Sequence, residues 1–313
     1  MVDPSIQERG VPERVAVVGL GAMGHAMALN LHDRGYSVIG CDPSPLARSN
    51  VEHCIDVCPD ISELGTVNAA VLSLPGADEV DSTTRWLADE SDCPLVIDTS
   101  TSHPTTSREL AQLMRKLSRV FIDAPISGGK SLAREGLVSS FVGGYPEDVV
   151  VAAPVLDALT GGKWRHMGGP GSGNVTKLIN NVMVATHLLV VAEAFSIGLE
   201  YGLDTHDLTE AIGTASGRSA AVEVNLPRWI INGSYDSAFA YRLMTRDASL
   251  AMNLAADLGL SVPVLTEVAK RWKGLESTLA PNDDFNLAVP AFLSETGCGQ
   301  PIRYSIDGER GTT

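Results

Sequence analysis

A glycine-rich segment near the N-terminus is the first group of residues whose spacing suggests chemistry: Gly19-Leu20-Gly21-Ala22-Met23-Gly24. It follows an apolar run at residues 15–18 and opens a helical pattern, a context that separates a dinucleotide-binding loop from an ordinary strand-to-helix turn. Gly19 permits a tight turn, Gly21 lets a pyrophosphate approach the backbone, and Gly24 lets the helix pack against the strand. Because the N–H groups and positive dipole of a helix N-terminus attract phosphate, the segment predicts a dinucleotide-binding site.

Asp42 stands at the end of the second expected strand, 18 residues after Gly24. A carboxylate at this place can accept hydrogen bonds from both ribose hydroxyls of NAD, and it repels the 2′-phosphate of NADP. No arginine follows directly, the nearest being Arg48, so the sequence favours NAD over NADP. Asp-Pro also commonly starts a turn, and Asp42 can serve both purposes.

A second candidate for chemistry lies in the middle of the chain, where Lys177 and Asn181 are four residues apart in a helical pattern. This spacing places both side chains on one face of a helix, one turn apart. Apolar residues surround Lys177, and a lysine is rare in an interior stretch unless it is paired or functional. A lysine near a helix end can also extend its ammonium group to water, and on local sequence alone this alternative is favoured.

The elements that must position these residues change in character along the chain. Short β-branched runs predict strands at residues 15–18, 37–41, 69–74, 95–98 and 120–122, with edge strands at 137–144 and 163–167. Helical patterns lie between them, for example at 23–34 and 106–116. The alternation predicts an α/β fold with a mostly parallel sheet, that is, a Rossmann-type dinucleotide-binding domain.

A cluster of glycine and proline at residues 168–173 ends this alternation. Helical patterns then follow at 175–201, 204–215, 247–258 and 262–273, so we expect an all-helical C-terminal domain. The expected domains are 1–172 and 173–313, joined by one long helix from about residue 173. Because that helix is apolar almost all round, we expect it to be buried, between domains or subunits.

Composition excludes several classes of protein. The 313 residues carry a formal charge of −15, so binding to nucleic acid or to an anionic membrane surface is not expected. The cysteines number five and form no C-x-x-C, and no His–carboxylate spacing suggests a metal site. The N-terminus lacks the apolar run of a signal peptide, and no uninterrupted apolar run reaches the roughly 18 residues of a membrane span, so we expect a cytoplasmic protein.

Four blocks of the sequence, in this order, resemble motifs of the β-hydroxyacid dehydrogenase family, of the 3-hydroxyisobutyrate dehydrogenase type. They are the glycine-rich loop with residues 27–31 behind it, Asp98-Thr99-Ser100-Thr101 with Pro104, Asp123-Ala124-Pro125-Ile126-Ser127-Gly128-Gly129, and the pattern from Gly168 through Gly171 and Gly173 to Lys177 and Asn181. The resemblance covers about Val15 to Asp284, nearly the whole chain.

The resemblance implies an active site in a cleft between the two domains and an oligomer, a homodimer or homotetramer, made by the helical domain. It implies that Leu74, Pro75 and Thr101 flank the cofactor. Ser127, Gly128 and Gly129 would bind the substrate carboxylate. Lys177 would be the acid/base, and Asn181 would hold the substrate beside it.

Three positions depart from the family pattern. Lys130 stands where the family often has an apolar residue, Leu132 where it often has a small one, and Arg246-Asp247 where it has Lys-Asp. We assign Arg246 to the cofactor-binding set, and either Lys130 or Arg246 could contact a second polar or anionic group of the substrate. Lys130 could equally face solvent.

The expected activity is an NAD-dependent interconversion of a short 3-hydroxy acid, or 2-hydroxymethyl acid, with its semialdehyde. The alternatives are an NADPH-dependent reductase of glyoxylate or a short semialdehyde, against which Asp42 speaks, and a non-catalytic dinucleotide-binding module. Lys177 speaks against the non-catalytic module, and also against a related imine reductase.

Overall fold

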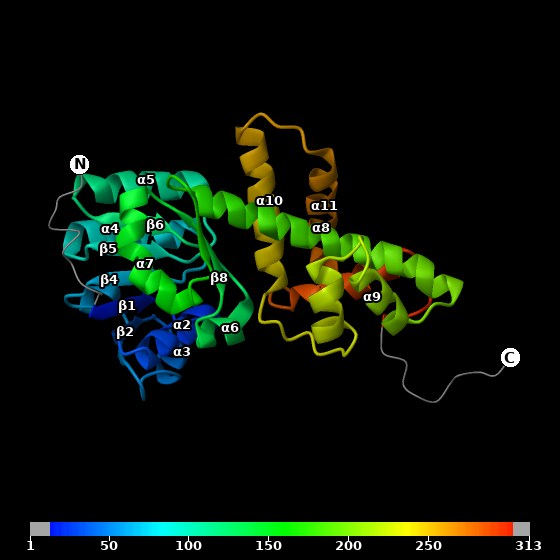
Figure 1. Cartoon of the computed structure of the whole chain (residues 1–313), viewed down its shortest axis with the longest axis horizontal. Helices are drawn as coiled ribbons and strands as arrows, with labels where there is room; N and C mark the ends of the chain where they lie inside the picture. Colours follow the sequence, from blue (N-terminus) through cyan, green and yellow to red (C-terminus); the bar gives the residue numbers. More distant parts are fainter. Residues whose placement is uncertain (1–12, 303–313) are drawn as a thin grey trace. The chain divides into compact units, whose positions relative to one another are not determined.

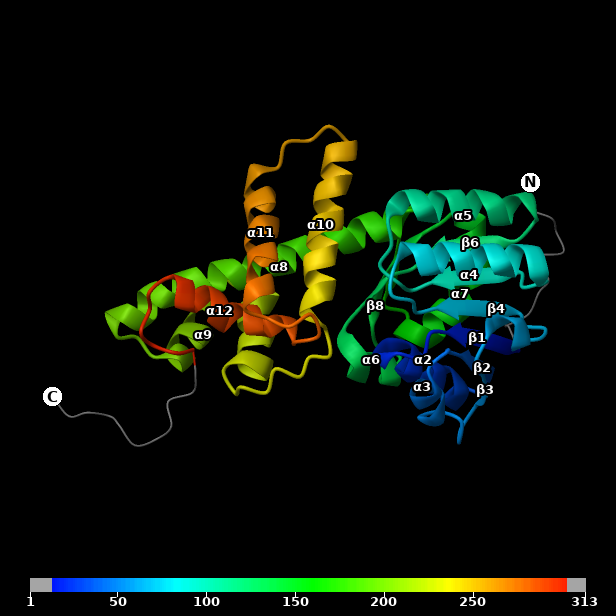
Figure 2. The same cartoon turned by 180° about the vertical axis from the view of Figure 1, so that it is seen from behind.

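The computed structural model describes residues 13–302. They divide into two compact units, and the division falls between Lys177 and Leu178. The first unit is an α/β unit built on one sheet, and the second is helical (Figures 1 and 2). Their division falls within the second turn of a long helix, whereas the sequence placed the boundary just before that helix.

The sheet of the first unit has the strand order β3-β2-β1-β4-β5-β6-β8-β7, with β9 paired to β8. Strands β1 to β6 are parallel, and their order is the 3-2-1-4-5-6 of a doubly wound dinucleotide-binding fold, which confirms the predicted fold class. Strand β8 runs antiparallel to β6 and β7. The strands are β1 (Arg14–Val18), β2 (Ser37–Cys41), β3 (Asp56–Cys58), β4 (Ala69–Leu72), β5 (Leu95–Asp98), β6 (Val120–Asp123), β7 (Ile126–Ser127), β8 (Ser139–Gly143) and β9 (Trp164–Gly168).

Both faces of this sheet are covered, because successive side chains of a strand point to opposite faces and nearly all are apolar. In β1, Val15 and Val17 pack into one hydrophobic cluster with α2 and α7, and Ala16 and Val18 into another with α4 and α5. The helices of the unit are α2 (Ala22–Asp33), α3 (Pro45–Ser49), α4 (Ala77–Glu90), α5 (Pro104–Lys116), α6 (Gly129–Glu135) and α7 (Pro146–Thr160), with a 3₁₀ turn η1 (Ile61–Glu63).

The second unit is built around Trp272, whose side chain is completely buried. Its indole N–H donates to the Ala185 carbonyl oxygen at 3.0 Å, and its ring packs against Tyr241 and Phe292. The elements around it are α9 (Thr205–Gly213), the π-helix η2 (Ala221–Ile230), α10 (Tyr241–Asp257), α11 (Pro263–Gly274), η3 (Leu275–Ser277), η4 (Phe285–Leu287) and α12 (Ala288–Glu295).

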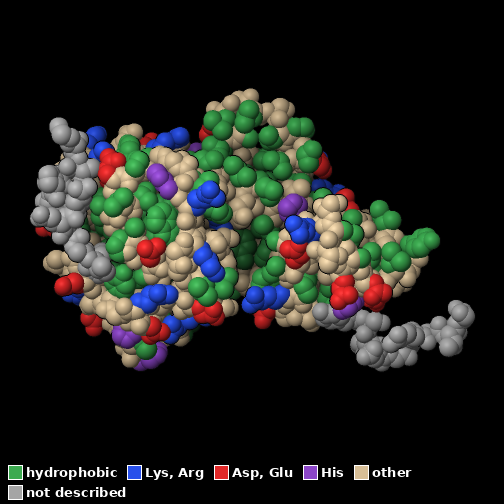
Figure 3. Space-filling view, in the orientation of Figure 1, with side chains coloured by type: hydrophobic (Ala, Val, Ile, Leu, Met, Phe, Trp, Pro, Cys, Tyr) green, Lys and Arg blue, Asp and Glu red, His purple; other side chains and the backbone are tan. Residues whose placement is uncertain are grey.

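The long helix α8 (Ser172–Tyr201) begins in the first unit and continues into the second. One of its faces is exposed in the single chain, so the burial of this face between subunits stays a prediction. Ile179, Met183, Val190, Ile197 and Tyr201 are each at least half exposed, and their spacing of four and seven residues puts them on a single stripe. Figure 3 shows apolar side chains gathered at the far end of this helix, on the right of the view.

Helix α8 is also long and apolar enough, by length and composition, to cross a membrane. Polar residues interrupt its apolar ones, so no uninterrupted apolar run in the sequence marks this helix. Half of the most apolar window is buried inside the protein, and the core helix of a globular protein passes the same test.

Candidate active site

The glycine-rich loop joins β1 to α2 in a geometry that only glycine allows at two of its positions. Gly19 has a φ of +90°, and a Cβ at Gly24 would lie 1.8 Å from the Gly19 carbonyl oxygen. At Gly21, by contrast, a Cβ would meet nothing within 4 Å, so the backbone is open on that side. Helix α2 has no side-chain cap at its N-terminus. The loop, which also contains Leu20, therefore fits a pyrophosphate held by the backbone N–H groups at the start of α2, around Ala22 and Met23.

Asp42 is tied to this loop across the sheet. Its Oδ2 accepts from the Leu20 N–H at 2.7 Å, and its Oδ1 accepts from the Ser44 N–H at 2.8 Å. The second contact is the turn role that the Asp-Pro pair suggests. Arg48 lies against the same corner, because its Nη1 donates to the carbonyl oxygens of Asp42 and Pro43 at 2.7 and 3.0 Å. A cation six residues along the chain is thus part of the candidate ribose site.

Leu74 and Pro75 follow β4, and Thr101 follows β5, so all three lie at the carboxyl edge of the parallel strands, where such sheets bind ligands. The Leu74 N–H donates to the Ser100 Oγ at 2.9 Å, which joins the two segments. Leu74 and Thr101 are half-buried and Pro75 is exposed.

The segment Ser127-Gly128-Gly129 is more ordered than the plain loop that local sequence allowed. Ser127 belongs to β7 and pairs with Ser139 of β8. Gly128 has a φ of +140°, and a Cβ there would lie 3.0 Å from the end of the Leu132 side chain, so Leu132 packs tightly against this glycine. Helix α6 begins at Gly129, and Lys130 on it is exposed.

Lys177 lies in the second turn of α8 and is only 7% exposed. Asn181 is one turn further along the same helix and is also buried. A buried lysine is uncommon, which sets Lys177 apart from the side chain extended to water that local sequence favoured.

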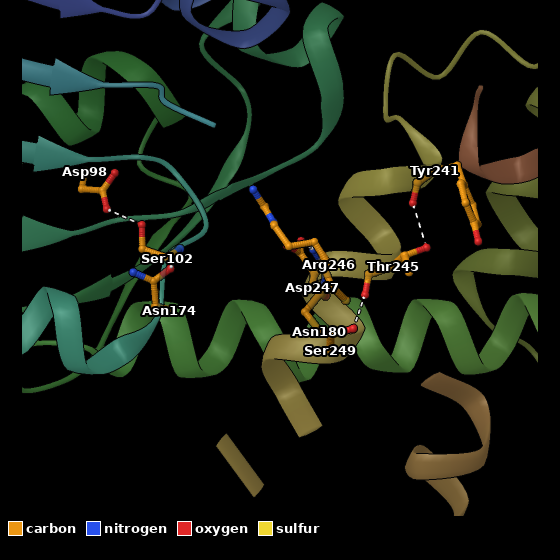
Figure 4. Close-up of polar contacts among 10 residues, drawn as sticks. Asp98, Ser102, Asn174, Asn180, Tyr241, Thr245, Arg246, Asp247 and Ser249 are labelled. Carbon is orange, nitrogen blue, oxygen red and sulfur yellow. Dashed lines mark hydrogen bonds and ion pairs between the residues drawn. The ribbon is translucent and has the colours of Figure 1, made fainter. Parts of the chain in front are cut away.

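In the second unit, Asp247 of α10 is completely buried and accepts hydrogen bonds from two side chains. Its Oδ1 accepts from Arg246 Nε and Nη2 at 2.9 and 2.7 Å, and its Oδ2 accepts from Asn181 Nδ2 at 2.6 Å. The Asn181 Oδ1 in turn accepts from Asn180 Nδ2 at 3.0 Å. Figure 4 shows Arg246 and Asp247 on the yellow helix beside Asn180. Asp247 therefore fixes the amide of Asn181.

Two more buried carboxylates end adjacent strands of the sheet. Asp98 of β5 and Asp123 of β6 are partners in the strand register, and both are completely buried. Burial raises the pKa of Asp98 to about 7, with the charge of Asp123 adding in the same direction. Burial also raises the pKa of Asp123, against the hydrogen bonds that it accepts from backbone N–H groups.

Comparison with known sequences agrees with this geometry. Residues 14–169 match the family model of the NAD-binding domain of 6-phosphogluconate dehydrogenase, and residues 171–292 match the model described as NAD-binding of NADP-dependent 3-hydroxyisobutyrate dehydrogenase. A probable 3-hydroxyisobutyrate dehydrogenase of Mycobacterium bovis is 32% identical, over 82% of this chain and 90% of its own length. The chain belongs to the β-hydroxyacid dehydrogenase family.

Other relatives of this dehydrogenase show the range of the family. The 2-(hydroxymethyl)glutarate dehydrogenase of Eubacterium barkeri is 26% identical, over 91% of this chain and 96% of its own. The structure of the 3-hydroxyisobutyrate dehydrogenase of Mycobacterium tuberculosis with L-serine has a TM-score of 0.80 at 29% identity, covering 88% of this chain and 98% of that one. The dehydrogenase is thus an oxidoreductase that acts on a CH–OH group with a nicotinamide dinucleotide.

Several buried polar residues around the start of α8 were not predicted from the sequence. Asn174, Ser102 and Ser107 are buried polar residues that no motif singled out, and Asp98 and Asp123 were only parts of quoted motifs. The one available signal was the position of each aspartate at the end of an apolar strand. A separate surface groove of about 820 Å³, lined by α9 and η2, contains none of the predicted site residues.

Proposed function

We propose that the dehydrogenase interconverts a short 3-hydroxy acid, or 2-hydroxymethyl acid, with its semialdehyde, with Lys177 as the acid/base. The observation that carries the proposal is the burial of Lys177 on α8, one turn from an asparagine whose amide is fixed by Asp247. The nicotinamide, when bound, accepts the hydride from the carbinol carbon.

Lys177 has the task of managing the proton. As the hydride leaves, the hydroxyl must lose its proton, and the neutral amine of Lys177 takes it. In the reverse direction the ammonium returns the proton and stabilises the developing oxyanion. Asn181 orients the hydroxyl or carboxylate without titrating, and Ser127, Gly128 and Gly129 bind the substrate carboxylate.

The substrate class rests on the family and on two cationic departures. The relatives named above are dehydrogenases of 3-hydroxyisobutyrate and of a hydroxymethyl dicarboxylic acid. Lys130 is exposed and the Arg246 side chain is 30% exposed, so each is accessible to a ligand, and one of the two is our candidate for a contact with a second carboxylate of the substrate. Arg246 also remains our candidate for a contact with the cofactor.

For the cofactor, we propose NAD rather than NADP, because Asp42 places a carboxylate beside the loop that receives the dinucleotide. Arg48 at the same corner supports the alternative, an NADPH-dependent reductase of glyoxylate or a short semialdehyde. The buried Lys177 argues against a non-catalytic dinucleotide-binding module.

We further propose a homodimer or homotetramer in the cytoplasm. The apolar stripe of α8 supports the oligomer, because an exposed row of Met183, Val190, Ile197 and Tyr201 is unusual on a monomer. Sedimentation of the purified chain checks this, and a monomer at all micromolar concentrations contradicts it.

The activity is tested with a panel of mono- and dicarboxylate 3-hydroxy acids, following NADH production. Lys177→Ala should lower kcat by about 10²–10⁴-fold. The NADH affinity should stay nearly unchanged, because the glycine-rich loop is intact. Lys177→Arg should not restore the rate, since a guanidinium stays protonated. A Lys177→Ala enzyme that turns over within a few-fold of the wild type would contradict the assignment.

A further inference from the structure

The first turn of α8 is held by a buried hydrogen-bond network centred on Asn174. The Asn174 side chain is completely buried, its Oδ1 accepts from the Ser102 N–H at 2.9 Å, and its Nδ2 donates to Ser107 Oγ at 3.0 Å. The side chain therefore joins α8 to the segment between β5 and α5. Figure 4 shows Asn174 beside Ser102 and Asp98.

A carboxylate from the sheet caps the same helix. The residue before α8 is Gly171, which has no side chain to satisfy the free N–H groups of the first turn. Asp123 does this instead, accepting from the Gly171 N–H at 2.7 Å and from the Asn174 N–H at 2.8 Å. The first turn of α8 also packs closely on β8, because a Cβ at Gly173 would lie 2.3 Å from the Phe141 carbonyl oxygen. The start of α8 is thus fixed against β6 and β8.

The network continues to the segments assigned to the cofactor. The Ser102 Oγ donates to Asp98 Oδ2 at 3.3 Å, and the Ser100 N–H donates to Asp98 Oδ1 at 2.9 Å. The Ser100 Oγ accepts from the Leu74 N–H. A continuous line of hydrogen bonds therefore runs from Leu74 to the first turn of α8, through side chains that are at most 5% exposed.

Asn174 and Lys177 are three residues apart on one helix, so they share a face. We propose that Asn174 is a positioning residue: it holds the face of α8 that bears Lys177 at a fixed angle to the cofactor-flanking segments Leu74–Pro75 and Thr101. This inference rests on the proposed role of Lys177. Without the Asn174 amide, the buried Ser102 N–H and Ser107 hydroxyl lose their partner, and the first turn of α8 is no longer tied to the β5–α5 segment.

The test compares Asn174→Ala with a matched control, Asn225→Ala. Asn225 is also a buried asparagine, and it donates to Asn286 Oδ1 at 2.7 Å in the second unit. Asn174→Ala should lower kcat about 10- to 100-fold, as expected for a misplaced catalytic group, while the Kd for NADH changes by less than about threefold. The control should lose similar stability and keep its kcat within about twofold. The limb of the kcat–pH profile should move by about half a pH unit or more in Asn174→Ala alone.

Hydrogen exchange gives a readout independent of turnover. In Asn174→Ala the backbone N–H of Ser102 should exchange faster. The backbone N–H of residue 174 should stay protected, because it still donates to Asp123. If Asn174→Ala does not fold, Ser107→Ala is used instead, because it removes one hydrogen bond of the network. It should lower kcat by a smaller factor and leave the NADH affinity nearly unchanged.

Two results separate this inference from the proposed function. If Lys177→Ala is inactive while Asn174→Ala and Ser107→Ala keep the wild-type kcat and pH profile, the positioning role is wrong and the role of Lys177 stands. If Lys177→Ala stays active, the proposed function fails, and with it the inference. A kcat loss in Asn225→Ala equal to that in Asn174→Ala also overturns the positioning role.

Discussion

At the scale of single residues, Asp42 serves two purposes that one carboxylate can combine. It accepts one hydrogen bond from Leu20 and one from Ser44, and an ionised carboxylate offers about four acceptor sites. It can therefore brace the glycine-rich loop and still accept from ribose hydroxyls. Arg48 is a cation beside Asp42, which a site specific for NAD does not need. Its Nη1 already donates to two carbonyl oxygens.

The cofactor preference is tested by Asp42→Asn combined with Pro43→Arg. Removing the carboxylate ends the repulsion of a 2′-phosphate, and the new guanidinium can bind it. The preference should move toward NADP by about 1–3 kcal/mol. Direct titration of NADH and NADPH measures this, and Asp42→Asn alone separates lost repulsion from gained attraction. A wild-type protein that binds NADPH at least as tightly as NADH contradicts our interpretation of Asp42.

Residues in local motifs were predictable, and residues acting across the sheet were not. The glycine-rich loop and Asp42 are recognisable because their spacing along the chain reflects a single βαβ unit. Asn174 gave no signal, because its partners Ser102 and Ser107 are about 70 residues away and meet it only once the sheet has formed. The same holds for the cap that Asp123 supplies to α8.

At the scale of elements, two glycines of the loop between β1 and α2 differ in the space around them. Gly24 faces the Gly19 carbonyl oxygen, and there is no space for a side chain. Gly21 has an ordinary φ of −60° and open space where a Cβ would be. Gly24 is therefore needed by the fold, and we propose that Gly21 is needed for the approach of the ligand.

Gly21→Ala and Gly24→Ala therefore form a matched pair. Gly21→Ala should leave the Tm almost unchanged and weaken NADH binding, because the new methyl group occupies the space through which the pyrophosphate approaches. Gly24→Ala should lower the free energy of unfolding by about 1–3 kcal/mol or more, because the new methyl group meets fixed backbone. Thermal unfolding without ligand and NADH titration measure the two effects. Equal Tm losses in both variants would count against this division.

Several helices escaped prediction because proline or glycine interrupts their patterns. Helix α7 contains Pro154, and α6 is a short helix that ends at Gly136 in the left-handed conformation. The π-helix η2 contains Pro227 and ends where the Ile231 N–H donates to the Leu226 carbonyl oxygen. Its wider turn accommodates a residue without an N–H, a solution that helical periodicity does not reveal. Helix α10 begins at Tyr241, six residues before the predicted start.

At the scale of the whole molecule, an acidic chain buries some of its carboxyl groups, two of them at the carboxyl ends of neighbouring strands. Asp98 and Asp123 lie side by side in the strand register, and Asp148 in α7 also has its pKa raised by burial, to about 6. Each of these folded-state pKa values lies above the ordinary value of 3.8. Between the ordinary pKa and the raised pKa, each of these groups binds more protons in the folded protein than in the unfolded chain, so its contribution to stability falls as the pH rises.

For Asp98 the window runs from about pH 4, below which both states are protonated, to about pH 7, above which both states are ionised. Over this window Asp98 should reduce the free energy of unfolding by at most about 4 kcal/mol, at about 1.4 kcal/mol for each pKa unit, and above pH 7 the loss is constant. Asp98→Asn keeps an acceptor for the Ser100 N–H and removes the charge. Its stability relative to the wild type should therefore rise between pH 4 and 7.

Denaturant unfolding of the α/β unit at several pH values measures that difference, with Asp60→Asn as the control. Asp60 is exposed, and hydrogen bonds from Ser62 lower its pKa, so its contribution is present above pH 4 and is lost only at lower pH. Asp60→Asn should leave the pH dependence of the free energy of unfolding between pH 4 and 7 as it is in the wild type. If Asp98→Asn and the wild type lose stability in parallel across that range, burial does not raise the pKa of Asp98 in the folded protein, and the prediction is wrong.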